Sequence, residues 1–187
     1  MKLSQKKIVE AALALLQKDG LAALNMRALA GRLGVQQSSL YRHVANKDDL
    51  ISLMVSTLHE NAFYSVSRTK DWRNWLVAFG TAFHAILAET RDSAKLSILA
   101  GPSPKTAETI IEEFSEPLAV AGISKRQALT FHTAVVSFTI GWLMFEQNDR
   151  FNHHLGQMID FASGFETGLR ALAYGFHEEP VRMAAAN

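Results

Sequence analysis

Between Gly34 and Lys47 the chain carries a run of side chains that form hydrogen bonds but mostly bear no charge, GVQQSSLYRHVANK. A short helix over residues 36–43 would be held to a core by Leu40 and Val44 alone, so its other face would be free. Amide, hydroxyl, phenol and imidazole groups match the hydrogen-bonding groups of base edges and phosphates. The segment therefore predicts a helix that reads the major groove of a nucleic acid.

Charge is distributed unevenly along the chain. Residues 1–47 contain eight Lys and Arg against two acidic residues, a balance of +6, although the 187-residue chain carries only +1. Residues 48–187 have a balance of −5. This asymmetry favours a polyanionic partner for the first quarter of the chain. A basic solvated surface without a partner is the alternative that charge alone leaves open.

Residue types that support catalysis or metal binding are scattered. The chain has no cysteine, which excludes disulfides, thiolate ligands and a cysteine nucleophile. His153 and His154 are neighbours, and adjacent helical residues do not face the same way. Glu112, Glu113 and Glu116 are expected on a solvated helix face. With no Ser-His-Asp order, glycine-rich phosphate loop or HExxH motif, we expect no enzyme, metal site or cofactor.

The period of the apolar residues predicts an all-α chain. Ser4, Asn25, Asn46 and Ser124 are expected helix caps, and glycines end several helices. Residues 149–156 are expected to form a turn, and a tail is expected from Pro180. The expected helices span residues 4–19, 26–33, 36–43, 47–67, 72–89, 94–99, 105–121, 124–148 and 157–176.

The second and third expected helices are short and joined by a tight turn at Gly34. Small and apolar residues form the seam between them, which is typical of a helix-turn-helix. We therefore predict a DNA-binding domain over residues 1–47 and a helical bundle that binds a ligand and dimerises over residues 48–187. The seam consists of Leu29, Ala30, Val35 and Leu40.

Residues 127–145 contain no Asp, Glu, Lys or Arg and are long enough to span a bilayer. The stretch includes Gln127, His132, Ser137 and three threonines, and it stands alone, so we predict a buried bundle helix and no membrane association. The N-terminus lacks the apolar core and cleavage site of a signal peptide. A cytoplasmic location is expected.

The segment 26–51, MRALAGRLGVQQSSLYRHVANKDDLI, resembles the DNA-binding signature of the TetR family of bacterial repressors. TRDSAKL, ALTFHTAVVSFTIGW and FEQND, which follow later, are similar to segments of the tetracycline-repressor class of that family. The resemblance is strong to about residue 55 and weaker beyond. It implies a homodimer that binds a palindromic operator in double-stranded DNA and is controlled by a small-molecule effector in the bundle.

The resemblance also implies roles for single residues. Arg27 would reach a guanine edge or the backbone, and the Gln37 amide would read a base, with adenine as its natural bidentate partner. Lys47 and the first amides of the helix it opens would hold a phosphate. The full set of expected DNA contacts is Arg27, Gln36, Gln37, Ser38, Ser39, Tyr41, His43 and Lys47.

The chain departs from the tetracycline-repressor class at its drug site. Ser97 stands where that class is expected to have a histidine that holds a Mg²⁺-bound drug, and Phe63 and Phe79 stand at further polar positions. Fewer nitrogen and oxygen donors indicate a largely apolar effector without Mg²⁺. The expected ligand contacts are Phe63, Phe79, Phe83, Ser97, Phe138 and Trp142.

Small residues form a stripe on each of the last two long helices. Because glycine costs helix stability of about 1 kcal/mol relative to alanine, repeated glycines need a packing reason. Close contact between helices of two subunits is one reason, and packing within the chain is the other. The expected dimer contacts are Ser137, Gly141, Gly164, Gly168, Ala171 and Gly175.

These observations favour a ligand-responsive repressor. The alternative is a helical small-molecule-binding protein or enzyme whose basic head binds a protein partner, and the uncharged polar face of residues 36–43 argues against it. DNA binding without any ligand, and activation in place of repression, remain open from the sequence.

Overall fold

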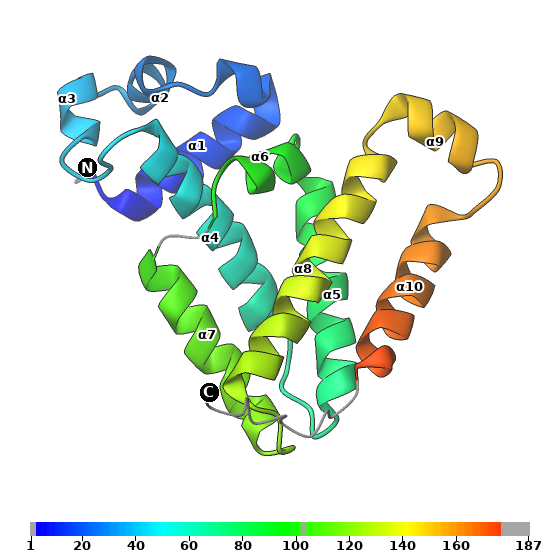
Figure 1. Cartoon of the computed structure of the whole chain (residues 1–187). Coiled ribbons are helices and arrows are strands. Elements are labelled where there is room, and N and C mark those ends of the chain that lie inside the picture. The colour runs from blue at the N-terminus through cyan, green and yellow to red at the C-terminus, as the bar shows by residue number, and fades with distance from the viewer. Residues whose placement is uncertain (1–2, 102–103, 177–187) are drawn as a thin grey trace, which may run out of the picture.

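The computed structural model describes residues 3–101 and 104–176, and every regular element in these ranges is helical. This confirms the all-α prediction. A small head lies at one end of a bundle of longer helices (Figure 1). The head consists of α1 (Gln5–Asp19), the 3-10 helix η1 (Leu21–Ala23), α2 (Met26–Leu33) and α3 (Gln37–Leu40). The bundle consists of α4 (Lys47–Ser65), α5 (Trp72–Glu89), α6 (Ser93–Leu99), α7 (Pro104–Ala119), α8 (Lys125–Glu146), α9 (Asp149–Leu155) and α10 (Phe161–Gly175).

The four predicted caps are confirmed. Ser4, Asn25, Asn46 and Ser124 each accept a hydrogen bond from a backbone N–H in the first turn of the helix that follows. A cap satisfies a donor that has no partner within the helix. Cap residues therefore located these helix starts to within about one residue.

Residues 149–155 form the helix α9, so the turn expected at 149–156 was wrong. The side chain of Asn148 accepts from the amides of Arg150 and Phe151, which starts a new helix directly after α8. The side-chain amide of Asn152 donates to the Glu146 carbonyl across the bend at 3.0 Å. Local side-chain hydrogen bonds thus stabilise a helix where a turn was expected.

Two other boundaries differ from the expected ones by three residues or more, and the remaining differences are of one or two residues. α3 ends at Leu40, not at residue 43, because the amides of His43 and Val44 both bond to the Leu40 carbonyl and close a turn. α10 begins at Phe161, four residues later than expected. The tail expected from Pro180 lies outside the described residues.

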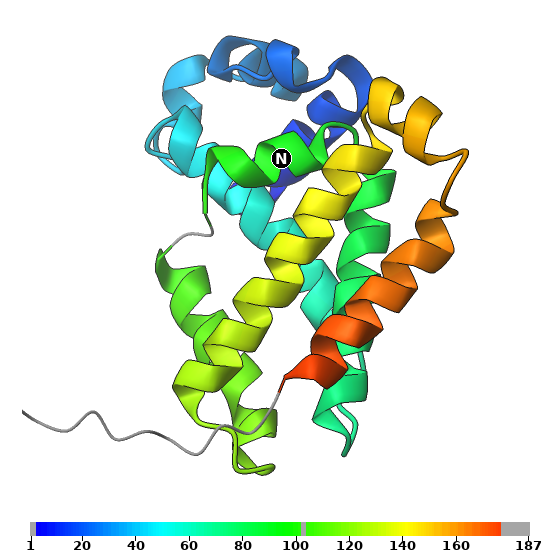
Figure 2. The same cartoon turned by 45° about the vertical axis from the view of Figure 1, so that its right-hand side comes forward.

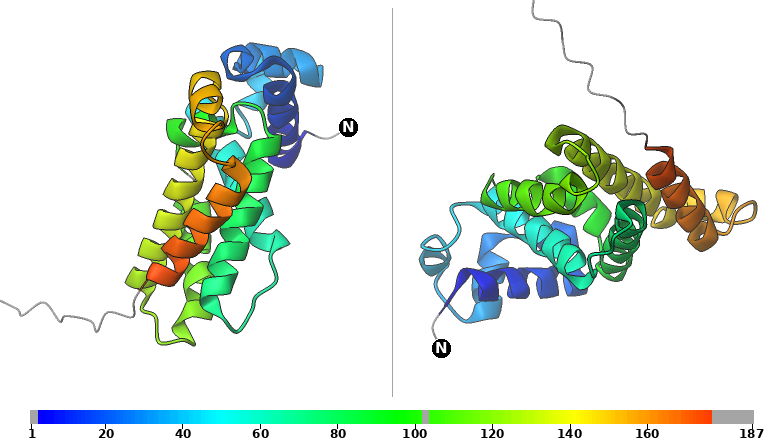
Figure 3. Two further views of the ribbon diagram at one scale, coloured as in Figure 1. Left: turned by 90° about the vertical axis from the view of Figure 1, so that its right-hand side faces the viewer. Right: turned by 90° about the horizontal axis from the view of Figure 1, so that it is seen from below.

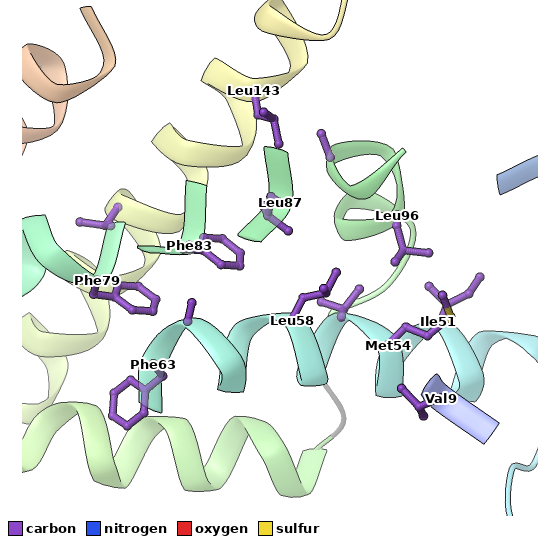
Figure 4. Close-up of a cluster of buried hydrophobic side chains, with 14 of the residues drawn as sticks. Val9, Ile51, Met54, Leu58, Phe63, Phe79, Phe83, Leu87, Leu96 and Leu143 are labelled. Carbon is purple, nitrogen blue, oxygen red and sulfur yellow. The ribbon is translucent and has the colours of Figure 1, made fainter. Parts of the chain in front are cut away.

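One continuous hydrophobic cluster connects the head to the bundle through α4. α4 packs against α1 on one side and α5 on the other. Figure 4 shows the labelled side chains of Val9, Met54, Leu58 and Phe83 along this path. The division between domains at residue 47 stays a prediction.

α5, α8 and α10 lie side by side in the bundle (Figures 2 and 3). A Cβ on Gly80 of α5 would come within 3.0 Å of Leu169 and Val135. Gly80 therefore permits the close approach of all three helices.

α8 differs from its prediction as a buried helix. Within the described ranges it is the one helix long and apolar enough to cross a membrane, and 28% of its most apolar 18-residue window is buried. One face enters the core, and the other face is exposed at Thr130 and Ser137. The apolar composition of α8 is thus not explained by packing within one protomer. Its core-facing residues are Ala128, Phe131, Val135, Thr139 and Leu143.

Candidate functional site

The turn between α2 and α3 depends on Gly34. Its φ of 65° lies in the left-handed region, which glycine adopts without a steric cost. The Gly34 amide bonds to the carbonyls of Ala30 and Gly31, and Val35 N–H bonds to Ala30 at 3.1 Å. These bonds end α2 and turn the chain into α3, as expected for a helix-turn-helix.

α3 is anchored by few residues and presents the rest to solvent. Leu40 and Val44 are almost fully buried. Gln36, Gln37, Ser38 and Tyr41 are exposed, whereas Ser39 and His43 are half-buried.

Gln37 and Tyr41 are bonded to each other across one turn of this surface. The Gln37 amide donates to the Tyr41 hydroxyl at 3.0 Å. This bond orients both side chains before any partner binds and leaves the Gln37 amide oxygen available as an acceptor.

Two cations flank this surface. Arg27 is exposed in the first turn of α2, and Lys47 is the exposed first residue of α4. Asn46 caps α4 through the Asp49 amide at 2.8 Å. The segment from α2 to the first residue of α4, which carries all eight predicted contacts, lies at the end of the molecule opposite the α7–α8 turn (Figure 1).

A cavity of about 300 Å³ lies inside the bundle. α4, α5, α6, α7 and α8 all contribute to its wall, which is mainly apolar. The lining residues are Val55, His59, Phe83, Ser97, Ala100, Gly101, Ala107, Ile110, Ile111, Leu129, His132, Thr133, Val136 and Ile140.

Two histidines meet in this cavity. The Nε2 atoms of His59 and His132 lie 2.7 Å apart, so one ring donates and the other accepts. Phe79 and Phe83 pack on His59, and Phe79 and Phe114 pack on His132. Burial lowers the pKa of His59 to about 4, and burial together with the charge of His59 lowers that of His132 to about 3. Both rings are therefore neutral at pH 7.

The predicted ligand contacts separate into three groups. Phe83 and Ser97 line the cavity. Phe63 and Phe79 are buried behind its wall, where Phe63 packs edge-on against Phe79 (Figure 4).

Phe138 and Trp142 do not line the cavity, which corrects the expectation of a single pocket lined by all six residues. They lie on another face of α8 and pack on Phe165 of α10. The helical period alone did not show which partner each face of α8 would meet.

The histidine pair was missed by sequence reasoning. His59 and His132 are 73 residues apart, and no local pattern connects them. His59 falls one turn after Val55 on α4, so a cavity-facing stripe was the one signal available. Within the described ranges, no group of three or more His, Cys, Asp or Glu could hold a metal ion.

The chain is similar to known proteins in both sequence and structure. The family profile described as "Bacterial regulatory proteins, tetR family" matches residues 8–54. The class A tetracycline repressor from transposon 1721 of Escherichia coli is 36% identical over 148 residues, which cover 78% of this chain and 68% of that protein. The chain belongs to the TetR family of transcriptional regulators.

Two further similarities bear on function. An HTH-type transcriptional regulator of Saccharopolyspora erythraea is 34% identical over 142 residues, which cover 74% of this chain and 59% of that protein. The structure of a class A TetR in complex with 5a,6-anhydrotetracycline and magnesium has a TM-score of 0.72 at 30% identity, and covers 92% of this chain and 97% of that one. TetR-family regulators are ligand-responsive DNA-binding repressors.

The predicted dimer residues of this TetR-family chain fall into two groups, those packed within the protomer and those left uncovered. A Cβ on Gly168 would lie 2.7 Å from the Phe138 ring, and one on Gly164 would lie 3.1 Å from Trp142. Packing within the protomer thus explains these two glycines. Gly141 and Gly175 face open space, and Ser137 and Ala171 are exposed.

A hydrogen-bonded joint connects α6 to the head. Asp92, which precedes α6, accepts from the Leu21 amide of η1 at 3.0 Å. The Arg91 amide and guanidinium donate to Gln17 and to the Lys18 carbonyl at the end of α1. The bond from Leu21 lowers the pKa of Asp92 below its usual value. Since α6 also carries Ser97, one short helix touches both the cavity and the head.

We expect the free energy of unfolding to fall as the pH drops from about 6.5 to about 4. In this range the unfolded chain protonates its histidines while the buried pair stays neutral, so protons favour unfolding. The slope should reach about 1.4 kcal/mol per pH unit for each buried histidine. Urea denaturation at fixed protein concentration measures it.

His132→Leu should make this slope shallower than in the parent chain. His153→Leu, on the exposed helix α9, should leave the slope unchanged. Carboxylates that titrate in the same pH range contribute equally to the slopes of the parent and the variants, so their contribution cancels when the slopes are compared. Equal slopes for the parent and His132→Leu would show that the buried pair does not resist protonation.

Proposed function

We propose that this chain is a repressor that binds a palindromic operator as a homodimer and is released when a small, largely apolar molecule enters the cavity. The observation that carries the proposal is the exposed polar surface of α3, held by the Gly34 turn and flanked by Arg27 and Lys47. A helix supplied with amide and hydroxyl groups but no ion pairs suits direct reading of a major groove.

Cations around the reading helix support the same proposal. The +6 balance of residues 1–47 supplies an attraction to phosphates that does not depend on base sequence. Gln36, Ser38, Ser39, Tyr41 and His43 would add base or phosphate contacts. Arg27 would reach a base edge or the backbone.

The exposed faces of α8 and α10 supply the dimer contact in this proposal. α8 is apolar and largely uncovered in the protomer. A Cβ placed on Gly141 or Gly175 would have no neighbouring atom within 4 Å. Two copies joined through these faces would bury them and place two heads on one DNA duplex. Adjacent half-sites about 34–36 Å apart then require one fixed separation of the heads.

The cavity and the joint at Asp92 provide a route for release. A ligand shifts DNA affinity only if it binds one arrangement of the heads better than the other. Contact with Ser97 would bias α6, and the bond from Asp92 to Leu21 would pass that bias to the head.

Magnesium does not fit this cavity. Mg²⁺ prefers oxygen ligands in octahedral geometry, and the described lining has no carboxylate, with the two histidines as its metal-ligating side chains. The effector of this chain is therefore proposed to bind without Mg²⁺, unlike the anhydrotetracycline and magnesium held by the class A structure.

The DNA proposal is tested with the sequence that the chain selects from a random pool. Gln37→Ala should cost about 1–3 kcal/mol on that site and relax the preference at one position per half-site, because an amide that reads a base is lost. Lys47→Ala should weaken binding to all sequences alike and reduce the salt slope by about one. Gel-shift titrations over a salt series measure both.

Tyr41→Phe removes the bond to Gln37 within the free protein and one proposed phosphate contact but keeps the Gln37 amide, so it should weaken binding to selected and random DNA alike and leave the base preference unchanged. Equal losses of Gln37→Ala on selected and random DNA would make Gln37 a backbone contact and contradict base reading.

The dimer proposal predicts that Ala171→Arg gives a monomer with unchanged helix content, because charge would be buried between two subunits. Sedimentation equilibrium and circular dichroism measure this. Ala162→Arg is the matched control, since nine residues place it half a turn away on the same helix. A dimeric Ala171→Arg would remove this face from the interface. Gly168→Leu is unsuitable, because its side chain would strike Phe138 within the protomer.

The proposed route predicts that Asp92→Ala separates ligand binding from DNA release. An effector selected from a chemical library by its release of operator from the parent should still raise the melting temperature of the variant but release its operator less well. Asp92→Asn retains an acceptor for the Leu21 amide and should behave as the parent. Unchanged release by Asp92→Ala would exclude the joint from the route.

A further inference from the structure

Two polar side-chain atoms of residues that line the cavity are buried and have no hydrogen-bond partner, Nδ1 of His59 and Oγ of Ser97. They are the two such side-chain atoms in the described part of the chain, and both belong to residues of the cavity wall. An unpaired buried polar atom costs about 1–3 kcal/mol. Two in one cavity need an explanation, and a bound molecule that pairs with them supplies one.

His59 is placed firmly enough to act as a fixed recognition group. The residue is 5% exposed, it is bonded to His132 through Nε2, and its ring packs against both Phe79 and Phe83. The remaining ring nitrogen is the free atom. Ser97 approaches the same cavity from a different helix, α6.

Charge on the molecule is disfavoured. The described wall of the cavity contains no Asp, Glu, Lys or Arg. The rings that pack on the two histidines are phenylalanines. An ionised ligand would lose its hydration without gaining a counter-charge.

The histidine pair determines what the ligand must offer. If His59 donates through Nε2, its Nδ1 is an acceptor, and if His132 donates, His59 Nδ1 carries a proton and donates. The Ser97 hydroxyl also serves in either role. A hydroxyl on the ligand matches both atoms in either tautomer, whereas a carbonyl can only accept.

We propose that the cavity binds an uncharged, largely apolar molecule that carries a hydroxyl group, a phenol or an alcohol, held by His59 Nδ1 and Ser97 Oγ. This names the class of effector for the ligand response proposed above and rests on it in that respect alone. The volume of about 300 Å³ is at the small end of ligand pockets and suits a molecule of one or two rings.

The test compares three probes of one shape, namely 2-naphthol, naphthalene and 2-naphthoate. Equilibrium dialysis with the full chain, without DNA at pH 7.5, measures each affinity. 2-Naphthol should bind about tenfold more tightly than naphthalene, the gain of one or two net hydrogen bonds. 2-Naphthoate should bind more weakly than 2-naphthol. Equal binding of 2-naphthol and naphthalene, or tighter binding of 2-naphthoate, would overturn the proposal.

Substitutions test whether His59 Nδ1 and Ser97 Oγ cause the preference for 2-naphthol over naphthalene. Ser97→Ala and His59→Leu should each reduce the preference for 2-naphthol over naphthalene while naphthalene still binds. Ser67→Ala and His153→Leu, at exposed positions outside the cavity, are matched controls. If both cavity variants still prefer 2-naphthol over naphthalene as strongly as the parent does, the two atoms do not bind the hydroxyl group. If His59→Leu does not fold, Ser97→Ala and the three probes on the parent chain still decide.

Operator binding is measured separately, so that the two proposals fail independently. Selective binding of 2-naphthol without release of operator would support this cavity chemistry and contradict the ligand response. Loss of selectivity in a chain that binds its operator normally would overturn the cavity chemistry alone.

Discussion

The packing of α4 against both α1 and α5 is the constraint on which the rest of this structure depends. α4 begins at Lys47, on the surface of the head that is proposed to contact DNA, and it carries His59 to the cavity wall about three turns later. Since its buried residues belong to one continuous cluster, the helix cannot tilt in the bundle without moving its first turn. α4 thereby connects the proposed DNA-binding surface to the cavity through one rigid helix.

α6 provides the second connection. It is seven residues long, so it has little stability of its own and depends on its neighbours. Asp92 and Arg91 tie its beginning to the head, and Ser97 faces the cavity. A short helix held by polar contacts at its beginning alone is suited to shifting between two positions, whereas the aromatic core around Phe79 is not.

α8 shows how one apolar helix can serve several surfaces. His132 and Val136 face the cavity, while Phe138 and Trp142 face α10. The face that includes Ser137 is uncovered in the protomer. A charge-free stretch of nineteen residues thus meets the cavity on one face and α10 on another, and it leaves a third face open in the protomer.

The sequence by itself determined most of the helices and the helix-turn-helix head, because caps, glycine stops and the α2–α3 seam act between residues close in the chain; α9, expected as a turn, was the exception. Gly34 and the pattern around Leu40 were sufficient for the helix-turn-helix. The tertiary structure alone decided which residues line the cavity and which of the small residues pack within the protomer. His59 meets His132, and Gly168 meets Phe138, through the crossing of helices far apart in sequence. A helical period shows that a residue lies on an apolar face, but helix packing decides whether that face meets a core, a cavity or a second subunit.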